Sequence, residues 1–217
     1  IMSMELSLIE RPKVLLIRED YRRWKRAFDL VACLLLLPVA LPIMAVCAVV
    51  IWIDDPGPFL FRQPRTGKGG RRFLMYKFRT MVTNAEEMKK QYAHLNELTW
   101  PDFKITHDPR MTRVGRFLRK TSLDELPQLF NVLKGEMSLV GPRPTSFDVT
   151  TYQLWHTERL EVLPGITGLW QISGRSDVDF DDRLLLDLEY IERQSLWLDI
   201  QILVRTFGVM FSRRGAY

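Results

Sequence analysis

Two adjacent carboxylates, Asp124 and Glu125, follow directly on a run of cations, and they are the residues in this chain best suited to chemistry. The run contains Arg110, Arg113, Arg116, Arg119 and Lys120. Arginine binds phosphate oxygens through paired hydrogen bonds. A carboxylate can attack phosphorus, or it can hold a divalent metal together with phosphates. The pattern therefore favours a phosphate and metal site in which one carboxylate is free to act as a nucleophile.

The same residues also fit a purely structural interpretation. Ser122 and Glu125 have the spacing of a capping box, in which the two side chains close the start of a helix. Asp124 would then only compensate the helix dipole. A helix is predicted from about Leu126 to Leu133, and Pro127 suits its first turn. Both interpretations stand at this point.

Glycine- and proline-containing loops follow the carboxylates. The first is Gly141-Pro142-Arg143-Pro144, and the second runs from 163 to 170 and is followed by Gly174-Arg175. Glycines at this density suit a close approach of the backbone to a ligand, and Arg175 offers a further phosphate contact. A plain surface turn explains the second loop equally well.

A long apolar segment lies ahead of these motifs, because no charged residue occurs from Leu30 to Ile53. As one straight helix it is about 36 Å long, and a bilayer core is about 30 Å thick. Pro38 and Pro42 near its middle favour a kink. Both flanks are basic, with Arg22, Arg23, Lys25 and Arg26 before the segment and Arg62, Arg65, Lys68, Arg71 and Arg72 after it. We therefore expect a re-entrant hairpin that returns to the same membrane face. A kinked spanning helix is the alternative.

Composition narrows the class of protein. Of the 217 residues, 47% are hydrophobic and 26% are charged, which excludes a disordered tail, a collagen and a disulfide scaffold. The net charge of +5 is unevenly distributed, and the excess of Lys and Arg in the middle of the chain predicts an anionic partner such as a membrane surface. The two cysteines, Cys33 and Cys47, both lie in the apolar segment, so a reducing compartment is expected.

The remaining patterns predict a small hairpin and three helices. Short strands at Phe59–Phe61 and Phe73–Tyr76 flank a glycine-rich bend. A charged helix is expected over 84–98, and a second over Asp181–Arg193. The apolar stretch Leu196–Phe211 is predicted to lie at a membrane surface or to pack in the core, and the pattern leaves both open.

Taken together and in order, these motifs resemble the bacterial sugar transferases, the monotopic phosphoglycosyl transferases. The resemblance covers about Lys25 to Tyr217. It rests on Lys25-Arg26-Ala27-Phe28-Asp29, Tyr76–Met81, Arg119–Leu129, Gly141–Pro144, Pro164–Gly168 and Gly174-Arg175. It implies an α+β fold, in which a membrane-inserted re-entrant helix hairpin precedes a mostly helical cytoplasmic catalytic domain with a small β-hairpin and interfacial amphipathic helices.

The resemblance also implies an activity. Asp124 would attack the β-phosphate of a UDP-hexose, glucose or galactose, and expel UMP. Undecaprenyl phosphate would then take up the hexose phosphate, which starts exopolysaccharide, capsule or O-antigen synthesis. Mg²⁺ would bind at Asp124 and Glu125. Substrate phosphates and the nucleotide would be held by Arg119, Lys77, Pro142, Arg143, Pro144 and Arg175.

The same resemblance implies a location and an organisation. Family members break the re-entrant helix at a Ser-Pro pair. Here Leu41-Pro42 stands at that place, and Pro38 is an additional proline. The implied parts are a linker over 1–23 from a longer chain, the membrane helix over 24–54 and the catalytic domain over 55–217. The expected location is the cytoplasmic face of the bacterial inner membrane, and self-association is left open.

Two other classes of function compete with this one. In a non-catalytic membrane adaptor, the basic residues would bind anionic lipids and Asp124-Glu125 would be only a helix cap. A nucleic-acid binder is disfavoured, because the cations lack interleaved stacking aromatics and flank a membrane insert.

Overall fold

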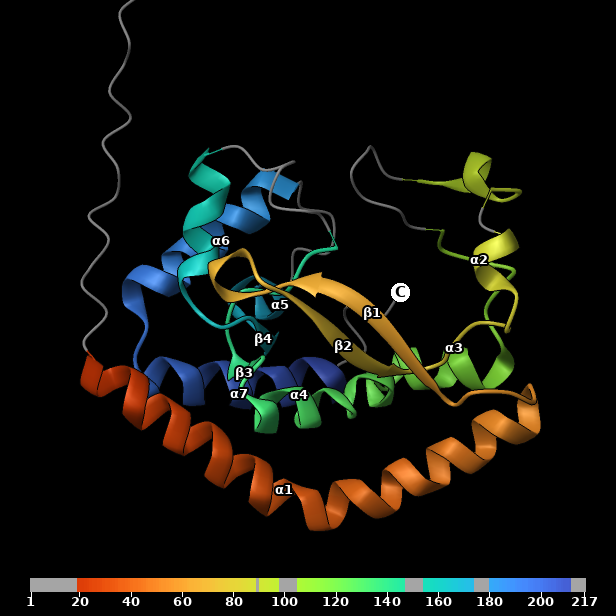
Figure 1. Ribbon diagram of the computed structural model, residues 1–217, viewed down its shortest axis with the longest axis horizontal. Coiled ribbons are helices and arrows are strands. Elements are labelled where there is room, and N and C mark those ends of the chain that lie inside the picture. The colour runs from red at the N-terminus through yellow and green to blue at the C-terminus, as the bar shows by residue number, and fades with distance from the viewer. Residues whose placement is uncertain (1–18, 89, 98–104, 147–153, 174–179, 212–217) are drawn as a thin grey trace, which may run out of the picture.

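The computed structural model describes residues 19–88, 90–97, 105–146, 154–173 and 180–211. Its longest element is helix α1, Glu19–Asp54, which has 36 residues. Figure 1 shows that α1 bends near its middle, so that both of its ends turn toward the rest of the chain. Pro38 and Pro42 lie inside the helix, where each removes a backbone donor and favours a bend. The apolar segment thus lies within one continuous helix that bends near its middle.

The predicted hairpin is confirmed, with longer strands than expected. Strand β1, Leu60–Thr66, pairs antiparallel with β2, Arg72–Phe78. The turn between them has Gly69 at a φ of 63°, a left-handed conformation that favours glycine. Asn131, which is fully buried, accepts from the backbone N–H of Tyr76 at 3.0 Å and holds the hairpin against the following helices.

The continuous helix predicted over 84–98 is wrong. The described part of this segment contains only two short pieces, α2, Ala85–Met88, and a 3-10 turn, Ala93–Leu95, with turns between them. Apolar residues recur here at helical spacing, at Ala85, Met88, Tyr92 and Leu95, but of these only Ala85 is buried. A helix of this length depends on packing an apolar stripe against the core, since its intrinsic propensity is not sufficient.

The carboxylates lie between two short helices. Thr112 caps α3, Arg113–Lys120, by accepting from the N–H of Gly115 at 2.9 Å. A 3-10 turn, η3, Leu123–Glu125, follows, and α4, Gln128–Lys134, ends at a left-handed Gly135. The chain then forms a parallel pair from β3, Ser138–Val140, and β4, Gly165–Thr167.

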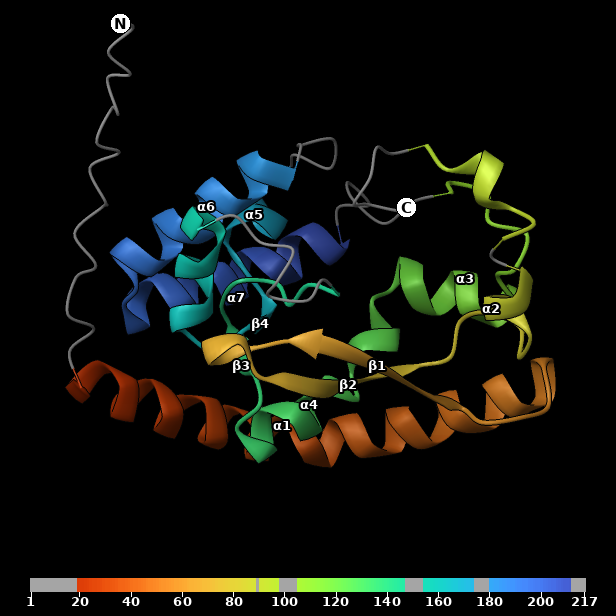
Figure 2. The same ribbon diagram turned by 45° about the horizontal axis from the view of Figure 1, so that its top comes forward.

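The C-terminal helices are confirmed almost to the residue. A 3-10 helix, η5, Leu154–Glu161, and the short α5, Leu169–Ile172, precede α6, Phe180–Arg193, and α7, Leu196–Phe211. Helix α1 packs against α3, α4 and α7. Figure 1 shows the hairpin and the other described helices on one side of α1, and Figure 2 shows α6 and α3 on opposite sides of the hairpin.

A motif near the start of α1 joins that helix to the core. Lys25 forms an ion pair of 2.8 Å with the fully buried Asp199 of α7, and Tyr190 donates to the same carboxylate at 2.7 Å. Arg26 donates to the carbonyl of Val132 at 2.6 Å, and Asp29 accepts from the N–H of Leu139 at 3.2 Å.

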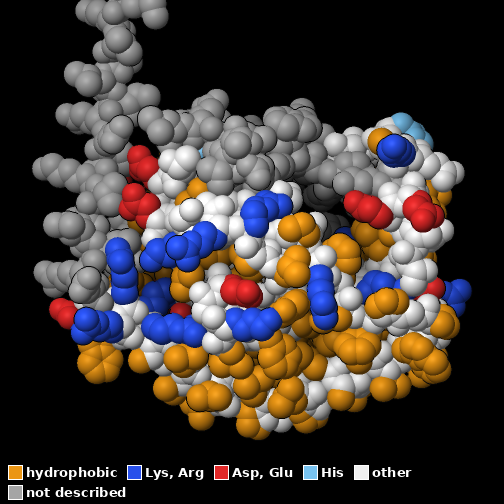
Figure 3. All heavy atoms as spheres, in the orientation of Figure 1, with side chains coloured by type: hydrophobic (Ala, Val, Ile, Leu, Met, Phe, Trp, Pro, Cys, Tyr) orange, Lys and Arg blue, Asp and Glu red, His pale blue; other side chains and the backbone are white. Residues whose placement is uncertain are grey.

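The opposite side of α1 is exposed and apolar. Within the described residues α1 is the one helix long and apolar enough to cross a membrane. Figure 3 shows hydrophobic side chains along the lower edge of the molecule and a band of Lys and Arg directly above them. The most exposed apolar side chains of α1 are Trp24, Leu34, Leu35, Val39, Val46 and Ile53.

Candidate active site

The turn that carries the carboxylates does not form a capping box. Ser122, directly before η3, has a φ of 56°, which is uncommon for a residue other than glycine. Its side chain makes no capping bond, and the turn is closed instead by the backbone N–H of Glu125, which donates to the Ser122 carbonyl at 3.2 Å. The capping interpretation is therefore wrong, and the side chain of Glu125 is free to point elsewhere.

Glu125 joins three separate segments through ion pairs. Its Oε1 lies 2.7 Å from Lys77 Nζ of β2 and 2.5 Å from Arg143 Nη2 of the loop after β3. Its Oε2 accepts a longer bond of 3.5 Å from Arg143 Nη1. Burial raises the pKa of Glu125, but Arg143 and Lys77 outweigh it and hold that pKa well below its ordinary value.

The pKa values of the two cations, Arg143 and Lys77, shift in opposite directions. Attraction to Glu125 raises the pKa of Arg143, and burial lowers the pKa of Lys77 although Glu125 acts against it. Glu125 thus fixes the positions of two cations that face the centre of the site.

Asp124 differs from Glu125 both in its contacts and in the direction of its pKa shift. It is 7% exposed and, within the described residues, has neither a hydrogen-bond nor an ion-pair partner. Burial raises its pKa, Lys77 opposes this, Glu125 adds to it, and Arg119 and Arg143 oppose it. Asp124 is therefore a carboxylate with unoccupied oxygens among three cations, as expected of a nucleophile that meets phosphate.

Arg119 reaches this centre because α3 lies very close to the backbone of Thr80. Its Nε donates to Thr80 Oγ1 at 3.0 Å, and Thr80 is 7% exposed. A Cβ at Gly115 would lie 2.0 Å from the Thr80 carbonyl oxygen, so only glycine allows this approach. Another member of the predicted cation run, Arg110, instead forms a buried ion pair of 2.7 Å with Asp108.

The Pro142-Arg143-Pro144 loop is held by residues that sequence reasoning missed. Arg159 donates to the Arg143 carbonyl at 2.5 Å and pairs with Asp187 of α6 at 2.6 Å. Both members of this pair are buried. No local sequence pattern predicts the roles of Arg159 and Asp187, because both are distant in sequence from the loop and from each other. The loop borders a cavity of about 10 Å³, which has room for one water molecule.

The structure brings five predicted residues together, namely Lys77, Arg119, Asp124, Glu125 and Arg143. Pro142 and Pro144 flank Arg143 and are buried. Arg175 lies outside the described residues, and Pro38 and Pro42 belong to the bend of α1.

The carboxylate oxygens of the site fit a magnesium ion whose remaining ligands would come from substrate phosphates and water. No group of three or more His, Cys, Asp or Glu suited to a metal occurs in the described ranges. Mg²⁺ commonly uses one or two carboxylates and completes its shell with phosphates and water. The oxygens of Asp124, and Oε2 of Glu125 with its long bond to Arg143, supply such a pair.

Comparison with known proteins identifies the class. The bacterial sugar transferase family matches residues 20–213, and the chain belongs to this family. It is 44% identical over 230 residues to the undecaprenyl-phosphate galactose phosphotransferase of Salmonella typhimurium, which covers 99% of this chain and 48% of that protein. It is 45% identical over 205 residues to the undecaprenyl-phosphate glucose phosphotransferase of Komagataeibacter xylinus, with 89% of this chain and 37% of that protein covered.

A third relative is shorter. The exopolysaccharide production protein ExoY of Rhizobium meliloti is 38% identical over 198 residues, and the match covers 89% of this chain and 88% of that protein. By contrast, the chain spans about half of the length of the Salmonella protein and a smaller share of the Komagataeibacter protein.

Proposed function

We propose that this chain transfers a hexose-1-phosphate from a UDP-hexose, glucose or galactose, to undecaprenyl phosphate and releases UMP. The reaction would initiate exopolysaccharide, capsule or O-antigen synthesis. The proposal is carried by Asp124, a buried carboxylate without a partner in the described part of the chain, surrounded by Lys77, Arg119 and Arg143. The names of the relatives, which are undecaprenyl-phosphate galactose and glucose phosphotransferases, supply the substrate class.

In the first step an Asp124 oxygen attacks the β-phosphorus of the UDP-hexose. The bond from that phosphorus to the bridging oxygen breaks, the electron pair leaves with UMP, and the hexose phosphate stays on Asp124 as an acyl phosphate. In the second step a phosphate oxygen of undecaprenyl phosphate attacks the same phosphorus and frees the carboxylate. Lys77, Arg119 and Arg143 offset the negative charge that collects in both steps.

Magnesium would be held by Asp124 and by Oε2 of Glu125. When bound, it would offset charge on the diphosphate and on the departing UMP. Glu125 would in addition keep Lys77 and Arg143 in place. Removal of divalent metal with EDTA should abolish UMP release, and added Mg²⁺ should restore it.

The exposed apolar side of α1 supports insertion into one leaflet of the bacterial inner membrane, with the domain from 55 to 217 on the cytoplasmic face. Both ends of the bent helix turn toward that domain (Figure 1). Cysteines placed at the exposed Asp20 and Pro58 should both react with an impermeant maleimide from the cytoplasmic side. Labelling of the two sites from opposite sides would instead indicate a spanning helix.

The central experiment is UMP release by the purified protein in detergent with Mg²⁺ and a panel of UDP-sugars, with and without undecaprenyl phosphate. Asp124→Asn should lose turnover, whereas Asp182→Asn at an exposed position of α6 is the matched control and should keep it. Turnover that survives in Asp124→Asn would exclude Asp124 as the nucleophile. If the unmodified protein released no UMP with any donor, the result would favour the membrane adaptor.

A further inference from the structure

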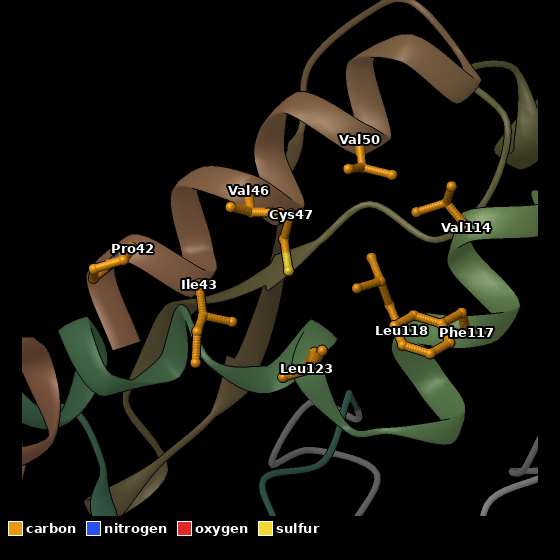
Figure 4. A pocket seen from close by; sticks show the side chains of 9 residues that line it. All are labelled: Pro42, Ile43, Val46, Cys47, Val50, Val114, Phe117, Leu118 and Leu123. Carbon is orange, nitrogen blue, oxygen red and sulfur yellow. The ribbon is translucent and has the colours of Figure 1, made fainter. Parts of the chain in front are cut away.

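An apolar groove lies between the second half of α1 and α3 and ends at the turn that carries the carboxylates. Its volume is about 350 Å³, and its lining has no polar surface. Figure 4 shows Ile43, Val46 and Cys47 of α1 on one side and Phe117 and Leu118 of α3 on the other, with Leu123 at one end. The groove is therefore an apolar surface, and its residue Leu123 immediately precedes Asp124 of the candidate active site.

We infer that this groove binds the isoprene units nearest the phosphate of the polyprenyl phosphate acceptor. The inference rests on the proposed function and adds a place for the acceptor. Leu123 lines the groove and immediately precedes Asp124, which lies among Lys77, Arg119 and Arg143. An apolar channel that leads to a cluster of cations complements a ligand with an apolar tail and an anionic head.

The open side of the groove faces the same surroundings as the apolar side of α1. Ile43, Val46 and Val50 line the groove and are 38%, 63% and 39% exposed. A lipid tail can therefore leave the groove along α1 without crossing a polar surface. Ligand pockets commonly measure about 300–1,000 Å³, so a groove of this size holds only a short part of a long polyprenyl chain.

The position of Leu123 favours a polyprenyl phosphate over a glycerophospholipid. In a polyprenyl phosphate the hydrocarbon begins directly at the phosphate ester oxygen. In a glycerophospholipid, polar ester and glycerol groups separate the phosphate from the acyl chains. Because Leu123 lines the groove and is directly followed by Asp124, the arrangement suits a ligand whose hydrocarbon begins close to its phosphate. Burying ester groups there without hydrogen-bond partners would cost free energy.

The test fills the groove and measures the two half-reactions separately. Val46→Trp places a large ring in the groove, and Val49→Trp places the same ring on an exposed position of α1 that does not line it. Val46→Trp should raise the KM for geranyl phosphate and for undecaprenyl phosphate by about tenfold, the effect of losing roughly two buried methylene groups. Val49→Trp should leave both values unchanged.

The burst of UMP released without acceptor reports only the first half-reaction. It should be equal in the unmodified protein and in Val46→Trp. Absence of the burst in the unmodified protein would contradict the proposed function itself. A normal burst together with an unchanged acceptor KM in Val46→Trp would overturn only the groove assignment.

Phe117→Ala provides a second, independent variant. Phe117 is 59% exposed, so its truncation should not unfold the protein, and it removes one wall of the groove. It should also raise the acceptor KM with an unchanged burst. An equal rise for Val46→Trp and Val49→Trp, or a rise that follows phospholipid content instead of acceptor, would contradict the assignment.

Discussion

Neutralising the two adjacent carboxylates should change stability in opposite directions. Glu125→Gln removes the negative charge that holds Lys77 and Arg143, whose N–O distances to Oε1 are 2.7 and 2.5 Å. Asp124→Asn removes a buried charge that has no direct partner in the described residues. Since burial raises the pKa of Asp124, folding costs the charged form of this side chain more free energy than the neutral form.

The structure sets the size of both effects. Breaking a buried ion pair costs about 3–5 kcal/mol. The lower end applies here, because the side chains of Lys77 and Glu125 are each 17% exposed and that of Arg143 is 34% exposed. For a protein of this length, about 3 kcal/mol lowers Tm by roughly 6–12 °C. Asp124→Asn should increase the free energy of unfolding by about 1 kcal/mol, a typical gain when a destabilising active-site residue is replaced. Its Tm should rise by roughly 2–4 °C.

The assay compares thermal melts of both variants with that of Asp182→Asn in one detergent at neutral pH. UMP release is measured on the same preparations. We expect Asp124→Asn to be inactive but more stable, and Glu125→Gln to be impaired and less stable. Equal losses of Tm in the two variants would refute the division of roles between a free nucleophile and a charge that positions two cations.

The remaining predictions concern the residues that support the site. Burial raises the pKa of Asp187 to about 6 against an ordinary value of 3.8, despite Arg159. The stability of the unmodified protein relative to Asp187→Asn should therefore be greatest below pH about 4 and fall by about 3 kcal/mol as pH rises through about 6. Melts of both proteins from pH 4 to 8 check this, and a flat difference would contradict it. Asp199→Leu should cost about 3–5 kcal/mol in urea unfolding, because Lys25 and Tyr190 lose their buried acceptor, and Asp199→Asn should cost less. Gly115→Ala should cost about 1–3 kcal/mol, because its Cβ would overlap the Thr80 carbonyl, and an unchanged melt would show that α3 can shift.

Local patterns in the sequence were sufficient for several elements. The charge-free run predicted an apolar membrane helix and its two prolines a kink; α1 is apolar and bent, whereas its re-entry into one membrane face stays a prediction. Apolar periodicity predicted α6, and a glycine-rich bend between aromatic strands predicted the hairpin. The neighbouring Asp124 and Glu125 stood out because two carboxylates after a run of cations form an unusual pattern. In each case the residues that decide the outcome are close together in the chain.

The tertiary structure alone decided how the site is built. Ser122 and Glu125 satisfy the capping pattern locally, but Lys77 and Arg143, which are distant in sequence, attract Glu125 more strongly than a backbone N–H does. The same holds for Arg159 and Asp187 behind the Arg143 loop, and for the groove between α1 and α3. The sequence determined which chemical groups are present. Packing determined which of them are paired and which one, Asp124, is left without a partner in the described structure, because contacts between distant segments arise only when the chain folds.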